Sequence, residues 1–262
     1  MPLIIERRGA VGVLTLSRPM ARNAWDEDYN EELIRILAEW EDDDGIRAVV
    51  LTGDETGGAF SAGANLAPTD AHTTGGPADF IKTLPKARRF AANVISDFPK
   101  PVVAAVNGYA IGIGCIVTFA CDLIVASERA EWRMPQVALG ILPAHAGAVR
   151  LARWVGKGQA MRMALGFPLR ADEAYRIGLA QWLVPHNELM ARAMVVAEHL
   201  AGLPPLAARL VKESMNNGQN IPNVRDAALA DMYRFYVLEL TEDKAEGHSA
   251  WRERREPNFR GR

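Results

Sequence analysis

The sequence predicts an α/β fold in which short buried strands alternate with helices. Three runs rich in β-branched and small apolar residues carry this prediction, namely RAVVLTG at 47–53, PVVAAVNG at 101–108 and CDLIVASE at 121–128. Each adjoins a segment whose apolar residues have helical spacing, which indicates β-turn-helix units repeated along one sheet. A chain of 262 residues, 49% of them hydrophobic, is long enough to bury such a sheet on both faces.

The chain is expected to open with a hairpin and a helix. LIIERR at 3–8 and VGVLTL at 11–16 are strand-like, with Gly9 in the turn between them. Asp26 is then a suitable N-cap, because acidic residues and apolar residues at helical spacing follow it. The run DDDG at 42–45 is expected to end this helix.

A long polar stretch interrupts the pattern before the second buried run. Residues 66–78, LAPTDAHTTGGPA, exceed a simple connector in length and are a candidate lid or binding loop. The next helix is expected from about Asp79 to Phe98, with an interruption near Pro85.

The last third of the chain is predicted to be mostly helical, with one short strand in AQWLV at 180–184. We divide the chain into a core at 1–200, which carries the ligand site, and a helical region at 201–262 for oligomerisation. The helical patterns there have more apolar positions than a single helix needs, so these faces pack either on another subunit or on the same chain. The predicted helices cover 186–202, 204–217, 222–240 and 242–255.

Charge and composition argue against several classes of protein. The net charge is -2 and only six of the 30 basic residues are lysine, so nucleic acid is not an expected partner. No apolar run reaches membrane-spanning length, and the charges at 6–8 do not fit a signal peptide. Cys115 and Cys121 lie in an apolar run and are expected to be free buried thiols, which fits a reducing, cytoplasmic compartment.

Common catalytic and phosphate-binding motifs are missing from the sequence. GIGCIV at 112–117 lacks the third small residue of a dinucleotide fingerprint, and TGDETGGAF at 52–60 does not end as a P-loop does. The sequence has no HExxH, no GxSxG and no clustered Cys and His residues, so no metal site is expected.

Two glycine-containing turns are the main candidates for chemistry. FSAGANL at 60–66 and GYAIGIGC at 108–115 each follow a β-branched strand closely and expose backbone N–H groups. Two N–H groups aimed at one point form an oxyanion hole, which stabilises a thioester carbonyl as it becomes an enolate. On spacing alone, purely structural turns remain the favoured interpretation.

The sequence resembles the crotonase (enoyl-CoA hydratase/isomerase) superfamily nearly from end to end. Each matching motif is weak by itself, but their order and spacing together are specific. The motifs are LSRPMARNAW at 16–25, IRAVVLTG at 46–53, FSAGANL at 60–66, KPVVAAVNGYAIGIGC at 100–115, CDLIVASERAEW at 121–132, MPQVALGILP at 134–143, RLARWVG at 150–156 and WRERREPNFRGR at 251–262.

The resemblance implies a crotonase-like spiral of ββα units with a helical C-terminal region. It also implies assembly into trimers, or into hexamers formed by two trimers. The implied ligand is an acyl-CoA, so that coenzyme A enters as part of the thioester substrate and no tightly bound cofactor is expected.

The resemblance also implies which residues form the ligand site. The two oxyanion donors fall on the N–H groups of Ala64 and Ile113; the second position is usually glycine, but an amide donates whatever its side chain. Arg22, Ala24, Ala62 and Ala64 would lie along the CoA, and Arg254 would approach its nucleotide end. Without the resemblance, these are a solvated arginine, loop alanines and a solvated helix charge.

At two positions the sequence departs from the hydratase pattern, which places glutamates there for proton transfer. These positions are Ile116 and Gln136 in this chain. Isoleucine has no exchangeable proton, and a glutamine amide can orient water or substrate but is no acid or base near neutral pH. A positioned proton-transfer group contributes about 10²–10⁴ in rate, so standard hydration is expected to be slow.

The alternation of the chain before Gln136 predicts where its side chain points. Trp132, Met134 and Gln136 share one parity, whereas Glu131 and Arg133 share the other, so Glu131 is not expected to substitute for the missing glutamate.

His145, in PAHAGA, is the best remaining acid/base candidate, because some members of the superfamily place an essential acid in this loop. Its ordinary pKa near 6.5 suits proton transfer, although a lone loop histidine is more often a helix cap or a solvated residue. Asp70 and His72 in the long loop are candidates to close over a bound acyl group, or are polar for solubility alone. Tyr109, Tyr233 and Tyr236 are candidate proton donors, although packing is the more usual role. A pocket lined by Trp132, Phe80 or Ile116 would suit an apolar acyl group. Cys115 is expected to be inert, and Asn65, where the family usually has Asp, to cap a helix.

The sequence therefore leaves three functions open. The first is an enoyl-CoA hydratase/isomerase-type enzyme with non-standard acid/base residues, catalysing isomerisation, decarboxylation, C–C cleavage or hydration of an unusual substrate. The second is a non-catalytic acyl-CoA binding or regulatory protein. RNA binding, known elsewhere in the superfamily, is a distant third because of the net charge.

Overall fold

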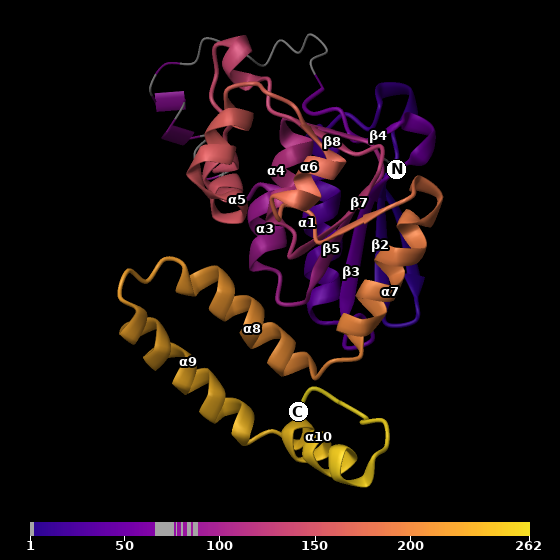
Figure 1. Ribbon diagram of the computed structural model, residues 1–262, viewed down its shortest axis with the longest axis vertical. Coiled ribbons are helices and arrows are strands. Elements are labelled where there is room, and N and C mark those ends of the chain that lie inside the picture. The colour runs from indigo at the N-terminus through magenta and orange to yellow at the C-terminus, as the bar shows by residue number, and fades with distance from the viewer. Residues whose placement is uncertain (1–2, 66–75, 77, 80, 83–84, 86–88) are drawn as a thin grey trace.

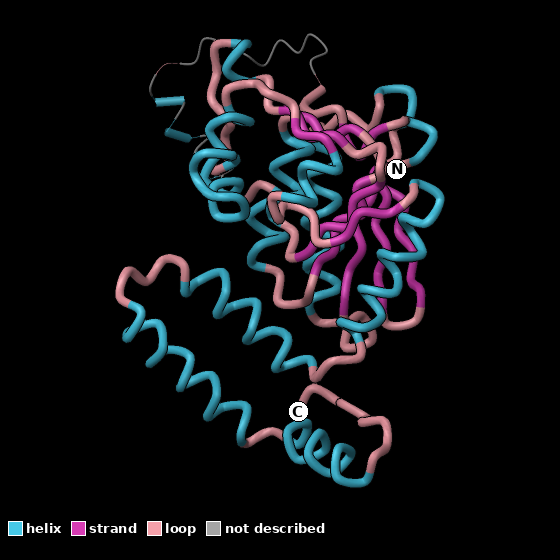
Figure 2. Tube along the Cα trace, viewed as in Figure 1, coloured by secondary structure: helices cyan, strands magenta, loops and turns pink. Residues whose placement is uncertain are grey.

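Two sheets and a set of helices make up the molecule in the computed structural model (Figure 1). The structure describes residues 3–65, 76, 78–79, 81–82, 85 and 89–262. The larger sheet has six strands in the order β1-β2-β3-β5-β7-β10, and the smaller has four in the order β4-β6-β8-β9. Figure 2 shows the strands gathered in one part of the molecule, with helices around them. The predicted α/β class is confirmed.

The larger sheet begins with the predicted hairpin and continues in parallel. β1 and β2 pair antiparallel across the Gly9 turn, and every later pair in this sheet is parallel. All residues of β3 are buried, as expected for a central strand with helices on both faces. The strands are β1 Leu3–Arg8, β2 Val11–Leu16, β3 Ala48–Gly53, β5 Val102–Val106, β7 Leu123–Ser127 and β10 Trp182–Val184.

A short strand of the smaller sheet follows each of the long strands β3, β5 and β7. β4 follows β3, β6 follows β5 and β8 follows β7, and helices α4 and α5 come after the second and third of these pairs. This succession is the ββα spiral that the resemblance implies. The elements are β4 Ala59–Ser61, β6 Tyr109–Ile111, β8 Glu131–Arg133, β9 Leu169–Arg170, α4 Ile113–Ala120 and α5 Gly147–Ala164.

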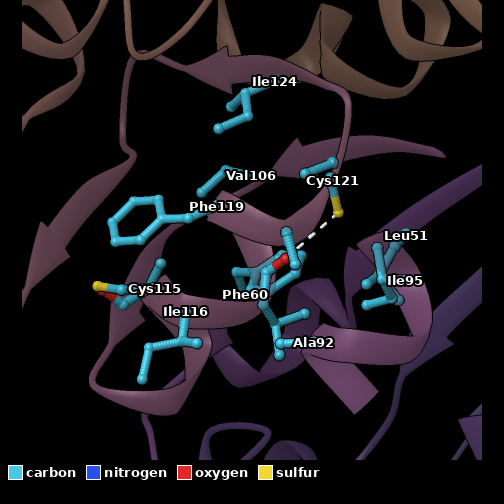
Figure 3. Close-up of a cluster of buried hydrophobic side chains, with 14 of the residues drawn as sticks. Leu51, Phe60, Ala92, Ile95, Val106, Cys115, Ile116, Phe119, Cys121 and Ile124 are labelled. Atoms are coloured by element: carbon cyan, nitrogen blue, oxygen red, sulfur yellow. Dashed lines mark hydrogen bonds between the residues drawn. The ribbon is translucent and has the colours of Figure 1, made fainter. Parts of the chain in front are cut away.

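Alternate residues of the long strands bury two separate apolar layers. One layer packs Val13, Val50, Val103 and Val125 against the helix α7, Leu189–Ala201. The other contains the opposite strand faces and the buried sides of helices α1, α3 and α4. Figure 3 shows part of this second layer. The additional helices are α1 Glu27–Glu41, α3 Ala91–Asp97 and α6 Ala171–Arg176.

The C-terminal helices extend away from the sheets (Figure 1). Lys212 fastens α8 to the core, because its Nζ donates to the Ile95 and Lys100 carbonyl oxygens and to Asp122 Oδ2, the last at 2.7 Å. No residue of α9 is buried, and its exposed side chains include Tyr233. The helices are α8 Pro205–Gly218, α9 Val224–Glu239 and α10 Glu242–Glu253.

Most local expectations agree with the structure. Asp26 caps α1 by accepting the Tyr29 N–H at 3.2 Å. Of the helix expected at 79–98, the described part includes α3, whereas several positions near Pro85 are not described. Strand β9 was not anticipated; it has two residues and pairs antiparallel with β8.

Within the described residues, no single helix is long and apolar enough to cross a membrane, although residues 186–201 and 205–218 meet those criteria as a pair bent by 107°.

Candidate functional site

Two glycine-containing turns meet at backbone contact after β4 and β6. Gly63 has φ +91° and Gly112 has φ +53°, conformations that side chains rarely adopt. A Cβ added at Gly63 would lie 2.8 Å from the Ile111 carbonyl oxygen, and one at Gly114 would lie 2.6 Å from the Ser61 carbonyl oxygen. Glycine is therefore required for the two turns to approach this closely.

The Ala64 N–H points away from the segment that contains Trp25. Trp25 N donates to the Gly63 carbonyl oxygen at 2.7 Å, and Asn65 N donates to the Trp25 carbonyl oxygen at 2.8 Å. In such a parallel bridge the N–H of the intervening residue, Ala64, faces the opposite side. None of the hydrogen bonds found among the described residues uses this N–H.

The Ile113 N–H lies at the start of helix α4. Because the first N–H groups of a helix have no partner within the helix, this one is open to a ligand, and the helix dipole favours negative charge there. Ala64 is exposed and Ile113 is half-buried, so both remain accessible. Each turn therefore carries one backbone N–H group that none of the hydrogen bonds among the described residues uses.

The residues expected along the CoA lie together on one side of these turns. Ala62 N donates to the Arg22 carbonyl oxygen at 3.0 Å, which places Arg22 and Ala24 beside Ala62 and Ala64. Arg22 is exposed and has φ 50°. Arg254 is not among them, because it follows α10 at the other end of the molecule (Figure 1).

Ile116 lies one turn along α4 from Ile113 and is apolar in its surroundings as well as in its side chain. It is 1% exposed and belongs to the buried layer drawn in Figure 3. A Cβ added at Gly147, the first residue of α5, would lie 2.8 Å from Ile116 Cγ1. The side chain thus fills space against the start of α5 and offers no group for proton transfer.

Gln136 places a neutral amide beside the second turn. It begins a 3-10 helix, η3 (Gln136–Leu139), and is 9% exposed. A Cβ on Gly112 would lie 3.3 Å from Gln136 Nε2, while Oε1 is buried and has no hydrogen-bond partner. A buried, unpaired polar atom costs free energy, which indicates a position that a ligand or water can complete.

The alternation that predicted the direction of Gln136 ends before this residue. Trp132 and Met134 are buried and Arg133 is exposed, as expected, and Glu131 is bound to Arg133. However, strand β8 ends at Arg133, so Gln136 is buried by the geometry of η3 and not by strand parity.

His145 is held in a turn immediately before α5. His145 and Ala146 have φ 51° and 60°, and the N-cap of α5 is Ala146, so the imidazole is no helix cap. The ring stacks on Phe90 with centroids 3.8 Å apart and planes at 18°. Burial, together with the Arg150 guanidinium, lowers the pKa of His145. The imidazole is therefore neutral near pH 7 and can accept a proton.

One protein-family model covers nearly the whole chain. The family described as Enoyl-CoA hydratase/isomerase matches residues 6–262. The chain belongs to this family.

Several members with known names or structures resemble the chain over nearly its whole length. A 2,3-dehydroadipyl-CoA hydratase from Escherichia coli is 36% identical, covering 99% of each chain. A probable enoyl-CoA hydratase from Mycobacterium tuberculosis is 34% identical, covering 98% of this chain and 97% of the relative. An enoyl-CoA hydratase structure from Bacillus anthracis superimposes with a TM-score of 0.90 at 29% identity, covering 100% of both chains.

The remaining candidate side chains are buried, exposed on the surface or outside the described residues. Cys115 is buried, its Sγ donates to the Ala110 carbonyl oxygen at 2.8 Å, and burial raises the pKa of its thiol. Tyr109 lies beneath the Arg133 guanidinium, and Tyr236 is exposed on α9, as is Tyr233. Asp70, His72 and Phe80 lie outside the described residues.

Neither of two surface hollows lies at the turns. One of about 560 Å³ is lined by α10 and the C-terminal tail, and one of about 130 Å³ lies between α8 and the end of α3. Among the described residues, no group of three or more His, Cys, Asp or Glu side chains could hold a metal ion.

Sequence reasoning missed two residues that shape the site. Trp25 forms the bridge that orients Ala64, and Phe90 supports the His145 ring. Trp25 and Phe90 also pack on each other, with ring centroids 6.1 Å apart. No motif marks Phe90, since its role depends on a contact with a residue 55 positions later.

Proposed function

We propose that the protein acts on acyl-CoA thioesters and stabilises an enolate-type intermediate with the backbone N–H groups of Ala64 and Ile113. The supporting observation is the close approach of two turns, each with an N–H group that has no partner among the described residues. Donors fixed by backbone geometry need no reorganisation when charge develops on the thioester oxygen, and such donors contribute strongly to catalysis.

Proton transfer is proposed to differ from standard hydration. With Ile116 and Gln136 at the glutamate positions, both usual proton-transfer groups are absent, and each would contribute about 10²–10⁴ in rate. His145, neutral near pH 7, is proposed as the base, and Gln136 as a group that orients water or substrate. The reaction is then an isomerisation, decarboxylation, C–C cleavage or hydration of an unusual substrate.

Coenzyme A is proposed to bind along Arg22, Ala24, Ala62 and Ala64. Arg254 lies too far along the molecule to join this site in the same chain, so it would act on the CoA of a neighbouring subunit. The exposed apolar side chains of α9 support an assembly interface, which we propose forms a trimer or a hexamer of two trimers, and we propose the cytoplasm as the compartment.

A second candidate is a non-catalytic acyl-CoA binding or regulatory protein. It is favoured by Ile116, which is packed as a core residue against α5 and leaves the position with no acid or base. In this case the backbone donors would hold the thioester without turning it over.

Binding and turnover should be measured separately on the purified protein. A short and a long enoyl-CoA are titrated by calorimetry, and products of an acyl-CoA panel are followed by mass spectrometry. Binding with turnover supports the enzyme, whereas binding without turnover across the panel supports the second candidate. Failure to bind any acyl-CoA would contradict both.

A further inference from the structure

Asn23 lies where the CoA-side segment turns toward the oxyanion site. Arg22 and Asn23 are two consecutive non-glycine residues with positive φ, 50° and 56°. Such a pair is unfavourable in a free chain and persists only where surrounding contacts hold it. Asn23 is fully buried, so its own side chain is available for those contacts.

The Asn23 amide joins three segments of backbone. Its Oδ1 accepts the Arg18 N–H at 3.0 Å. Its Nδ2 donates to the Asp54 carbonyl oxygen at 3.0 Å and to the Ala59 carbonyl oxygen at 2.8 Å. Both protons of the amide are therefore used, one after the end of β3 and one at the start of β4.

The residues on either side of Asn23 make the contacts that orient Ala64. Arg22 accepts the Ala62 N–H, and Trp25 donates to Gly63 in the bridge described above. The side chain of Asn23 thus holds the start of β4 through a hydrogen bond, while Arg22 and Trp25 hold the turn after β4 through backbone hydrogen bonds. We propose that Asn23 is a positioning residue for the oxyanion hole, setting the direction of the Ala64 N–H without touching the ligand. This inference rests on the proposed function of the Ala64 and Ile113 amides.

Aspartate and glycine also tolerate a positive φ, but neither can make all of the hydrogen bonds of the Asn23 side chain. An aspartate would place carboxylate oxygens against two carbonyl oxygens and donate to neither. A glycine would keep the positive φ but lose all three side-chain hydrogen bonds. Asn23→Gly therefore separates the effect of the side chain from the effect of backbone strain.

The direct readout is the carbonyl stretch of bound crotonyl-CoA labelled with ¹³C at the thioester carbonyl. Hydrogen bonds from an oxyanion hole move this infrared band to lower wavenumber. At saturating ligand we expect the band of the wild-type complex to shift, and the Asn23→Gly complex to lose at least half of that shift. Unlike a loss of thermal stability, a smaller band shift reports directly on the direction of the donor N–H groups.

A second variant perturbs Asn23 without removing it. A Cβ at Gly57 would lie 3.0 Å from Asn23 Nδ2 and 3.2 Å from its Cγ, so Gly57→Ala should displace the amide by a few tenths of an ångström and reduce the band shift. Ser17→Ala is the matched control. It removes a 2.7 Å hydrogen bond to the Asp54 carboxylate in the same region but leaves the Asn23 bonds in place, and the full shift is expected.

The outcomes separate this inference from the proposed function. A wild-type complex with no band shift, or no binding of crotonyl-CoA, overturns both. A full shift in Asn23→Gly or in Gly57→Ala, together with a shift in the wild type, overturns the positioning role alone. An equal loss in Ser17→Ala also overturns it, because general loosening of the region would then explain the effect.

Discussion

The two halves of the candidate site are built from different material. The donor half, defined as the turns at 62–65 and 112–114, consists of backbone amides whose approach depends on glycines. The proton-transfer half, defined as Ile116, Gln136 and His145, consists of side chains. A backbone amide donates whatever side chain it carries, so Ile113 can occupy a usual glycine position. By contrast, each side chain in the other half determines whether a proton can move at all.

The comparison teaches that the donor half constrains the sequence more tightly. A substitution at Ile116 or Gln136 changes a side chain at some cost in stability but adds no atom against the backbone of the two turns, whereas the glycines of the donor half already lie against backbone that cannot move independently. Experiments that exchange or restore single groups in each half can test this contrast.

The largest effect on turnover is expected from Gly114→Ala, which disturbs the donor half. Its Cβ would lie 2.6 Å from the Ser61 carbonyl oxygen, so the two turns must separate. We expect a loss of at least about 2 kcal/mol in the free energy of unfolding. Any turnover of acyl-CoA should fall about 100-fold, since a shift of about 1 Å in a catalytic group has an effect of that size.

Gly158→Ala is the matched control for this substitution. No atom lies within 4 Å of a Cβ added there, and the residue is part of α5, so the same change should stabilise the protein by up to about 1 kcal/mol. Chemical denaturation gives the unfolding free energy of both variants, and steady-state rates give their turnover. Equal stability and activity in Gly114→Ala and the wild type would refute the packing argument.

Ile116→Glu tests how far the proton-transfer half has been absorbed into the core. A carboxyl group at this position would be buried in an apolar layer against the start of α5, so we expect a loss of about 3 kcal/mol in unfolding free energy and a carboxyl pKa above its ordinary value. Ile116→Leu should lose less than about 1.5 kcal/mol. Stability close to wild type for Ile116→Glu would show that the position opens onto water.

His145→Ala is expected to have a smaller effect, a tenfold or greater decrease in turnover with little change in acyl-CoA affinity. The substitution removes the imidazole that stacks on Phe90 just before α5 and that is proposed as the base. His199→Ala removes an exposed histidine on α7 and serves as the control. An unchanged rate in His145→Ala, measured on any substrate that is turned over, would rule out the proposed base.

The pH dependence of stability should identify the same imidazole. Because the folded-state pKa of His145 lies below its ordinary value of 6.5, the unfolded chain binds the proton more readily. The stability due to the neutral ring is therefore complete above about pH 6.5 and is lost as pH falls below it. Melting temperatures at neutral and mildly acidic pH should differ less for His145→Gln than for the wild type; an equal difference would contradict the assigned pKa direction.

The fold could be predicted where a local pattern carries the information. The β-branched runs located β3, β5 and β7, and Asp26 with its acidic neighbours located the start of α1. The strand β9 could not be found in this way, because two residues have no periodicity and pair with β8 across nearly 40 positions.

The candidate site likewise has a part that local sequence patterns predict and a part that they do not. Glycine-containing turns mark the donor half, and the family resemblance names its amides. Asn23 and Phe90 carry no comparable signal, because their roles depend on contacts with Ala59 and His145 at distant positions of the chain. Gln136 is buried, as the alternation of residues before it predicts. However, strand β8 ends before Gln136, so the 3-10 helix η3 explains this burial.

The smallest effect is expected from Gln136→Glu, which restores one proton-transfer group with almost no change in shape. The amide lies beside Gly112 and its Oε1 has no partner, so a carboxyl group can take its place without new steric contacts. We expect hydration of crotonyl-CoA to rise severalfold, well below the full contribution of such a group, because Ile116 still provides no second acid or base. Gln136→Met, similar in size but without an acid, should give no rise. If Gln136→Glu binds crotonyl-CoA as tightly as the wild type and hydrates it no faster, the proton-transfer half differs from a hydratase by more than the loss of its carboxylates, and the position of the group relative to the bound thioester must have changed as well.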